Sequence, residues 1–205
     1  MIIIFATFRS THDFSSPLLN YTKEKVNTSF LCLLLSYNFI DIILSLIFIV
    51  ILFPVMILMC IITKIEFKGK IIYKQKRIGL NEKVYTMYKF KTMDDNTKNT
   101  TKVSRFIRKT GVDEILQLFN VLKGDMSLIG PRPFIEGDTL PSMYNKKRHT
   151  VRPGITGLAQ IKGRTTLTHK EKLKYDDIYI DNISFKLDIE IFFKTIIYIL
   201  KQIFF

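Results

Sequence analysis

Two adjacent carboxylates, Asp113 and Glu114, stand where a helix is predicted to begin. Apolar residues recur at i, i+3, i+4 and i+7 over residues 115–122, and Lys123-Gly124 supplies a cationic end and a terminal glycine. Carboxylates in a first turn ordinarily cap free amides and complement the helix dipole, which contributes ~0.3 to 1 kcal/mol. Carboxylates can also act as nucleophiles or bind a divalent cation beside phosphate. The local pattern alone favours the capping role.

Arginines recur in two loops, rich in proline and glycine, that follow this helix. Arg132 lies in MSLIGPRPF (126–134), and Arg152 and Arg164 lie in VRPGITGLAQIKGR (151–164). This density of proline and glycine predicts tight, poorly helical loops, in which guanidinium groups and exposed amides suit phosphate oxygens. One such arginine is ordinarily a solvated surface charge. Three in one short stretch favour an anion-binding site.

Basic elements also precede the carboxylate pair. Residues 71–93 predict two strands around a turn at 79–82, because aromatic and β-branched residues are frequent there. Lys89 and Lys91 would share one face of the second strand, since side chains alternate with period two. A short helix follows, and its basic side carries Arg105, Arg108 and Lys109.

A membrane segment comes before all of these elements. Residues 42–63 carry no charged side chain, and Pro54 interrupts them near the middle. A helix rising ~1.5 Å per residue needs about 20 apolar residues to cross a hydrocarbon core of ~30 Å. Pro54 predicts a kink or a break, so one kinked span and two half-helices that enter and leave one leaflet are both compatible with the sequence. Without further evidence, the kinked span is the ordinary interpretation.

Charge and composition limit the partners. The 205-residue chain has a formal charge of +13, with much of the excess directly after the apolar segment, which predicts a cytosolic flank. Such a surface favours anionic lipid headgroups or a polyphosphate ligand. No nucleic-acid-binding motif is present, and we expect no nucleic acid partner. Cys32 and Cys60 lie in apolar runs without metal-ligand spacing.

The two ends of the chain differ in character. Residues 1–35 form an arm of unknown role, which could be disordered, partly interfacial or an overextended start. A polar helix is predicted around residues 170–179. The apolar residues 189–205 include Lys194 and Lys201 and predict an interfacial helix.

Several of these segments carry a family resemblance. The Pro54 segment, YKQKRIG, KFKTM, RKTGVDEILQLFNVLKGDMSLIGPRP and RPGITGLAQIKGR resemble the bacterial sugar transferases that load a phosphosugar onto polyprenyl phosphate. These are monotopic phosphoglycosyl transferases. The resemblance begins near Phe39 and continues to the C-terminus, and its most specific block is the one around the Asp-Glu pair.

The resemblance implies an α+β, mostly helical fold. Residues 36–66 would form a re-entrant membrane helix broken at Pro54, residues 67–188 a cytosolic catalytic domain with a small β-hairpin, and residues 189–205 the interfacial helix. The expected location is the bacterial inner membrane, with the catalytic domain facing the cytosol.

The implied reaction moves sugar-1-phosphate from a UDP-sugar to undecaprenyl phosphate and releases UMP, with magnesium as the expected cofactor. It would begin a capsule, exopolysaccharide, O-antigen or glycoprotein glycan, with membrane lipids and downstream glycosyltransferases as further partners. Carried over by motif, Asp113 is the nucleophile that forms a covalent phosphosugar intermediate, and Glu114 is the metal-associated glutamate.

The resemblance also implies which residues bind substrate. Arg108 and Arg132 would neutralise pyrophosphate or lipid phosphate, and the free amides of the helix after the carboxylates would favour phosphate. Lys89 and Lys91 would line the same site. Nucleotide and phosphate contact is expected from Arg152, Gln160 and Arg164. Asp176 matches a recurrent acidic position, whose role stays open between function and a structural ion pair.

This sequence departs from the family pattern in several places. Phe53 replaces the usual serine before the proline, so a hydroxyl that could satisfy freed backbone groups is missing. Leu158 and Lys162 replace a common tryptophan and a small or amide residue. An alternative is therefore a catalytically degenerate membrane scaffold for other glycan assembly enzymes, although the complete Asp-Glu block argues against it.

Overall fold

The computed structural model describes residues 28–204 apart from residues 68, 95–99, 138–145 and 164–165. The chain divides into two units, Met1–Tyr37 and Asn38–Phe205. In the first unit only residues 28–37 are described, and they are helical. Most of the predicted arm, and the predicted ligand Arg164, lie outside the described residues. The second unit is mostly helical with two small sheets, as the predicted class requires.

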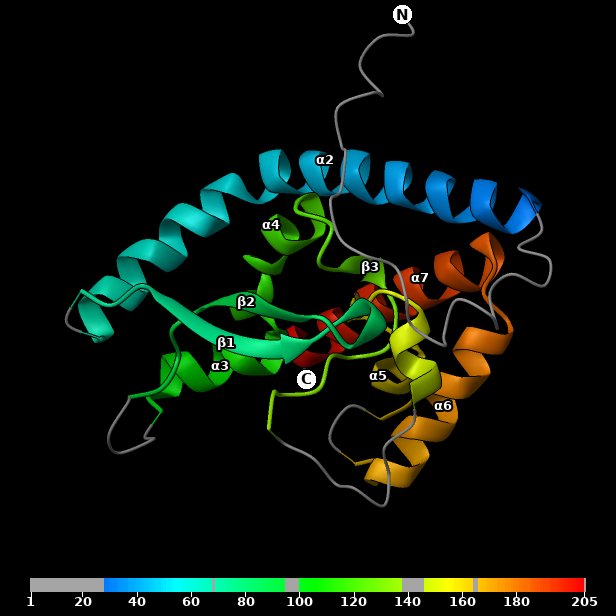
Figure 1. The fold of residues 1–205 in the computed structure, drawn as a ribbon. Coiled ribbons are helices and arrows are strands. Elements are labelled where there is room, and N and C mark those ends of the chain that lie inside the picture. Colours follow the sequence, from blue (N-terminus) through cyan, green and yellow to red (C-terminus); the bar gives the residue numbers. More distant parts are fainter. Residues whose placement is uncertain (1–27, 68, 95–99, 138–145, 164–165, 205) are drawn as a thin grey trace, which may run out of the picture. The chain divides into compact units, whose positions relative to one another are not determined.

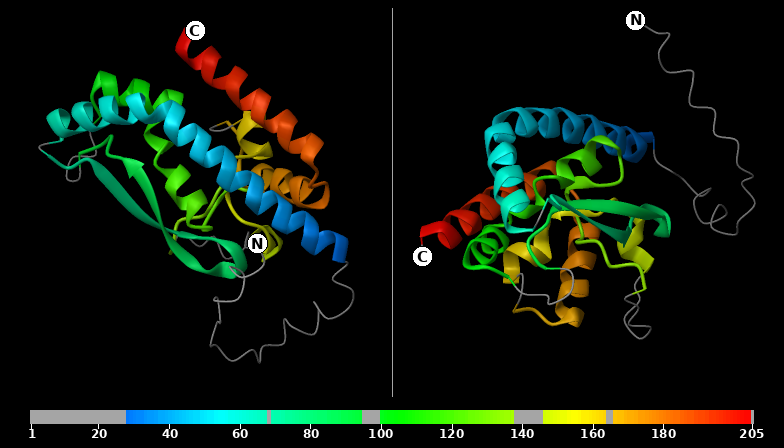
Figure 2. Two further views of the ribbon diagram at one scale, coloured as in Figure 1. Left: turned by 90° about the horizontal axis from the view of Figure 1, so that it is seen from above. Right: turned by 90° about the vertical axis from the view of Figure 1, so that its left-hand side faces the viewer.

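Helix α2, Thr28–Glu66, contains Pro54 in its interior. The helix continues through the proline and bends, so the predicted break is a kink (Figures 1 and 2). Its part Asn38–Glu66 has a mean hydropathy of 3.2 in its most apolar window, of which 17% is buried. By length and composition this part could cross a membrane.

The predicted hairpin is present. β1, Ile72–Ile78, pairs antiparallel with β2, Val84–Phe90, around the short 3₁₀ helix η1, Leu80–Glu82. The inner edge of β2 is held by the side chain of Asn120, which accepts from the Tyr88 amide (3.1 Å) and donates to the Thr86 carbonyl (2.8 Å). This buried amide side chain takes the place of a third strand.

The region around the carboxylate pair differs from the prediction. α3, Lys102–Thr110, is the expected short basic helix, capped by Thr101 and ended by Gly111 at φ 77°. The carboxylates then lie in a separate 3₁₀ turn, η2, Val112–Glu114, and α4 begins only at Gln117 and ends at Leu122. The single predicted helix is therefore two pieces, and neither carboxylate occupies the N-cap position of η2 or α4, which are Gly111 and Leu116.

The proline- and glycine-rich segments are more regular than predicted. β3, Ser127–Ile129, pairs in parallel with β4, Gly154–Thr156, and the segment after β4 forms α5, Leu158–Gly163. The two motifs meet backbone to backbone: a Cβ built on Gly154 would lie 2.7 Å from the Gly130 Cα. Glycine is needed at this contact because no side chain fits there.

Three further helices complete the described chain. The 3₁₀ helix η4, Lys146–Thr150, precedes β4. α6, His169–Asp181, begins with a capping box formed by Thr168 and Glu171. α7, Phe185–Phe204, starts earlier than the predicted interfacial helix and leaves many apolar side chains exposed.

Both ends of the apolar part of α2 are attached to the rest of the second unit. Near its start the Asp41 carboxylate accepts a hydrogen bond from the Leu128 amide (3.1 Å). At its end the Glu66 carboxylate accepts from the hydroxyls of Thr101 and Ser104, both at 2.6 Å. Between these points α2 packs into the core, which is formed by Met56, Met59, Phe90, Ile107 and Leu116.

Candidate active site

A cavity of about 660 Å³ lies in the second unit, where η2, β2, the loop after β3, α3, α5, α6 and α7 meet. Its lining is strongly cationic. The basic residues are Arg77, Lys89, Arg105, Arg108, Lys109, Arg132, Arg148 and Lys172. The acidic residues are Asp113, Glu114 and Asp176. Such a lining suits a ligand with several negative charges.

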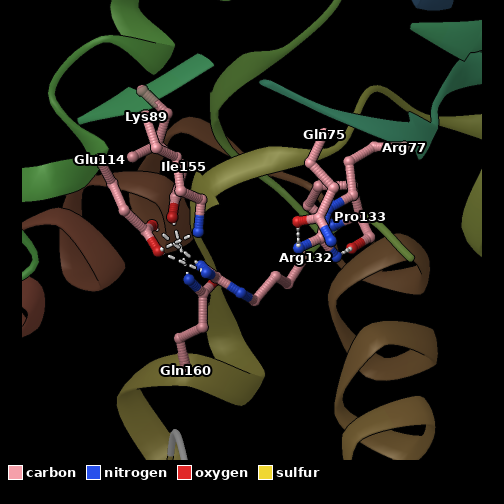
Figure 3. A network of polar contacts seen from close by, with 8 residues as sticks. All are labelled: Gln75, Arg77, Lys89, Glu114, Arg132, Pro133, Ile155 and Gln160. Atoms are coloured by element: carbon pink, nitrogen blue, oxygen red, sulfur yellow. Dashed lines mark hydrogen bonds and ion pairs between the residues drawn. The ribbon is translucent and has the colours of Figure 1, made fainter. Parts of the chain in front are cut away.

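Glu114 is the centre of the polar network in this cavity (Figure 3). Its Oε1 accepts from the Lys89 ammonium at 2.9 Å and from Arg132 Nη2 at 2.5 Å, while Oε2 accepts from Arg132 Nη1 at 3.1 Å. The carboxylate is buried, so this two-pronged contact with Arg132 is held away from bulk water. One buried carboxylate thus positions two cations that come from distant parts of the sequence.

The electrostatics of the two cations follow from this arrangement. Burial lowers the pKa of Lys89, although Glu114 opposes that shift. Burial also disfavours the charged form of Arg132, but the carboxylates of Glu114 and Asp113 outweigh this effect, so the pKa of the guanidinium is raised. Both shifts place Asp113 and Glu114 within electrostatic reach of the same cations.

Asp113 lies beside Glu114 in η2, is 7% exposed and lines the cavity. The turn is entered through Gly111, whose left-handed backbone ends α3. Nearby backbone amides are already bonded: Glu114 donates to the Gly111 carbonyl at 3.0 Å and Ile115 to the Val112 carbonyl at 3.3 Å. These two amides are therefore not among the free helix amides expected to bind phosphate.

Two arginines fasten the loop that carries Arg132. From β1, Arg77 donates to the Pro133 carbonyl (3.0 Å) and to the Gln75 side chain (2.6 Å), as Figure 3 shows. From η4, Arg148 donates to the carbonyl of Arg132 itself at 2.5 Å. The backbone of this loop is held from two sides, so the direction of the Arg132 side chain is fixed.

Arg148 is in turn held by Asp176 of α6. Their side chains are 3% and 5% exposed, and the guanidinium and the carboxylate are 3.0 Å apart. The guanidinium also stacks on Phe134, 3.4 Å from the ring centroid. Burial raises the pKa of Asp176 to about 6, even though Arg148 favours its charged form. Of the two roles left open for Asp176, the structure shows the ion pair.

Gln160 of α5 contributes a neutral polar group. Its Nε2 donates to the Ile155 carbonyl at 2.9 Å, which fixes the orientation of the amide because a carbonyl can only accept. Its Oε1 is buried and has no hydrogen-bond partner among the described residues. Gln160 lines the cavity, although this oxygen itself is covered by protein atoms.

Six of the residues predicted from the sequence line this one cavity: Lys89, Arg108, Asp113, Glu114, Arg132 and Gln160. Two do not. The Lys91 ammonium lies 5.6 Å from the centroid of the Phe67 ring, although the Lys91 amide still donates to the Ile71 carbonyl at 2.8 Å, just beyond the end of β2. Arg152 lies in the electrostatic field of Asp41, near α2.

Arg77 and Arg148 were not predicted as site residues, and both act through the backbone of the Arg132 loop. Arg77 was visible in the YKQKRIG motif, where its value as a loop anchor depends on the register of the hairpin. Arg148 lies in the run KKRHT, where nothing distinguishes it from its basic neighbours. Only the three-dimensional contact with Asp176 does so.

The acidic residues bear on magnesium binding. Within the described ranges, no group of three or more His, Cys, Asp or Glu side chains is placed to hold a metal ion. Mg²⁺ is commonly bound by one or two carboxylates together with substrate phosphates. Asp113 and Glu114 fit that mode, although the oxygens of Glu114 already accept from Lys89 and Arg132.

Comparison with known proteins places the chain in a family. The sequence signature of the family described as "Bacterial sugar transferase" matches residues 34–202. The chain therefore belongs to the bacterial sugar transferase family. This confirms the family resemblance predicted from its motifs, and it confirms the prediction that the protein is a transferase.

Three relatives illustrate this membership. An uncharacterized sugar transferase, EpsL, of Bacillus subtilis is 43% identical over 66% of this chain and 72% of its own length. A UDP-glucose:undecaprenyl-phosphate glucose-1-phosphate transferase of Klebsiella pneumoniae is 39% identical over 76% of this chain. A UDP-N-acetylgalactosamine-undecaprenyl-phosphate N-acetylgalactosaminephosphotransferase of Aeromonas hydrophila is 37% identical over 70% of this chain. The match spans 38% of the length of each of these last two proteins.

Proposed function

We propose that this chain transfers sugar-1-phosphate from a UDP-sugar to undecaprenyl phosphate, as the first membrane step of a surface polysaccharide or glycoconjugate. The observation that carries the proposal is the buried Asp113-Glu114 pair facing a cavity lined by eight basic residues. A pyrophosphate is shielded by its own negative oxygens, so an anionic nucleophile can approach only where fixed positive groups offset that charge. Relatives named as such transferases support the same reaction.

In the proposed first step, a carboxylate oxygen of Asp113 attacks the β-phosphorus of the UDP-sugar. The bond from this phosphorus to the bridging oxygen breaks, and UMP leaves with the electron pair. In the second step, a phosphate oxygen of undecaprenyl phosphate attacks the same phosphorus and releases Asp113. The product is undecaprenyl diphosphate sugar, and the enzyme carboxylate is regenerated.

The other cavity residues have defined tasks in this scheme. Glu114 positions Arg132 and Lys89. These two cations offset the negative charge of the diphosphate, which increases on the leaving UMP as the bond breaks. Gln160, whose amide is held on the Ile155 carbonyl, contributes a neutral polar part of the wall beside the donor. Mg²⁺, if held by Glu114 and Asp113 with the substrate phosphates, would draw off further negative charge.

The attachment of α2 supports a re-entrant topology. Asp41 and Glu66 lie near opposite ends of the apolar segment, yet each bonds to residues of the same unit. A straight span would place these ends on opposite sides of the bilayer. We therefore propose that α2 enters and leaves one leaflet at its Pro54 bend, with the catalytic unit on the cytosolic side.

Thiol labelling tests this topology. In a background with Cys32→Ser and Cys60→Ser, single cysteines at Asn38 and Lys64 should both react with a membrane-impermeant maleimide in inside-out vesicles. Neither should react in intact cells. Labelling of the two positions from opposite sides would show a spanning helix.

The reaction is tested by UMP release from detergent-solubilised protein given undecaprenyl phosphate, Mg²⁺ and a panel of UDP-sugars. We expect release with at least one sugar and its loss in Asp113→Asn, which keeps the shape of the side chain and removes its nucleophilic charge. Folding of the variant is checked by its melting temperature. A folded wild-type protein that is silent across the panel would favour the scaffold alternative.

A further inference from the structure

We propose that Arg105 and Lys109 of α3 form a second phosphate subsite, which holds the phosphate of the polyprenyl phosphate acceptor. The inference rests on the proposed function and assigns to its acceptor a place apart from the Arg132 network. Both residues line the cavity, and they lie one turn apart on the same helix.

The cations of this subsite form no ion pair with a carboxylate of the described chain. No ion pair joins Arg105, Arg108 or Lys109 to a carboxylate among the described residues, whereas Lys89, Arg132 and Arg148 are each paired with one. The side chains of α3 that face the cavity are exposed, and the buried residues of that helix are Ser104, Ile107 and Thr110. A row of unpaired cations on a cavity wall suits an anion that arrives with the substrate.

The other side of the same wall is apolar. On α3, Val103 and Phe106 are 47% and 51% exposed, and Phe106 lies one turn before Lys109. An amphiphile that crosses this edge could keep its chain on Phe106 while its phosphate reaches Lys109. An exposed apolar edge beside a cationic edge is typical of a helix that lies at a membrane surface.

Helix α7, which contacts α3, has the same two-sided character. Tyr198 and Gln202, one turn apart, line the cavity. The exposed apolar residues of this part of α7 lie on the opposite face, and they are Ile196, Ile197, Leu200 and Ile203. Both helices therefore present polar side chains to the cavity and exposed apolar side chains away from it.

This arrangement would let a soluble donor and a membrane-bound acceptor reach the same site. The UDP-sugar is soluble, whereas the acceptor phosphate is fixed to a long apolar chain, and both must reach the phosphorus beside Asp113. Since α3 and α7 both line the cavity and both carry exposed apolar side chains beside it, an acceptor whose chain stays in the membrane can place its phosphate on α3. The Arg132 network then remains available for the donor.

Equilibrium binding of undecaprenyl phosphate to protein in micelles, without UDP-sugar, tests the subsite independently of turnover. The double variant Arg105→Gln/Lys109→Gln should bind the acceptor at least tenfold more weakly, because it loses two charge-assisted contacts. The matched control is Lys102→Gln, an exposed cation of the same helix that does not line the cavity, which should change affinity less than twofold. Unchanged affinity in the double variant would overturn the proposal.

Two further arms identify the ligand. UDP affinity should stay within twofold in the double variant; an equal loss for UDP would assign these residues to the donor diphosphate instead. Phosphatidylglycerol at the same mole fraction should not displace undecaprenyl phosphate; equal displacement would show a general site for anionic headgroups and contradict the proposal. Failure of the wild type to turn over any UDP-sugar, with acceptor binding intact, would count against the proposed reaction and not against the subsite.

Discussion

Replacing Asp176 by asparagine tests how much the buried Arg148–Asp176 ion pair contributes to the free energy of unfolding. The substitution keeps the size of the side chain and leaves the Arg148 guanidinium buried without its counter-charge. Removing one partner of a buried pair typically costs about 3–5 kcal/mol. Arg148 retains the Arg132 carbonyl and the Phe134 ring, so we expect the lower end, about 3 kcal/mol at pH 7.5.

The stability difference between Asp176→Asn and wild type should depend on pH. Asp176 has a pKa of about 6 in the folded protein, raised by burial from 3.8, so its ionisation costs folding free energy as pH rises through 6. The Asp176→Asn variant has no such titration, so only the wild type gains stability as pH falls through 6. The stability difference between Asp176→Asn and wild type should therefore grow by about 1 kcal/mol between pH 7.5 and pH 5.

Thermal unfolding in detergent measures both quantities. A loss of about 3 kcal/mol corresponds to a melting temperature lower by roughly 6–12 °C at pH 7.5. The double variant Arg148→Met/Asp176→Leu removes both charges and should lose only about 1 kcal/mol, since desolvation of the pair offsets most of its attraction. A Tm difference that is equal at pH 5 and pH 7.5, or a double variant as unstable as the single one, would refute this reasoning.

Three other perturbations have expected outcomes. Glu114→Gln should lower the rate of UMP release by about 10²-fold or more, because Arg132 and Lys89 lose the charge that positions them; an unchanged kcat would contradict that role. Gly154→Ala should abolish folding at 37 °C, judged by gel filtration, because its Cβ would meet the Gly130 backbone, and a soluble monodisperse variant would show that the contact can open. Asp188→Asn should raise the Tm by about 2–4 °C at pH 7.5 and leave it unchanged at pH 5, since burial raises the pKa of Asp188 to about 6 and the folded protein bears the cost of ionisation only above that value.

The sequence predicts the elements whose signals are local. The hairpin follows from β-branched and aromatic residues around a turn, and the basic helix α3 follows from its apolar spacing. The Asp-Glu pair and Arg132 were found because their motifs are specific. All three lie together in the cavity, although the arrangement of Glu114 between two cations could not be read from spacing.

The misses have a common physical cause, which is contact between distant segments. β3 and β4 are three residues each, and they form because Gly130 and Gly154 let two backbones meet. Lys91 does not line the cavity, and its ammonium lies over the ring of Phe67, which is distant in the sequence. Neither fact has a signal in the local sequence, where glycine- and proline-rich segments predict loops and alternation predicts a shared face.

The fate of the β-phosphate tests the central claim most directly. With a UDP-sugar carrying ³²P at the β-position, undecaprenyl phosphate and wild-type protein, we expect the label in the lipid fraction and unlabelled UMP in the aqueous phase. The Asp113→Asn protein should leave the label on the nucleotide sugar. Release of labelled UDP, with an unlabelled sugar on the lipid, would show transfer of the sugar alone and contradict attack of Asp113 at the β-phosphorus.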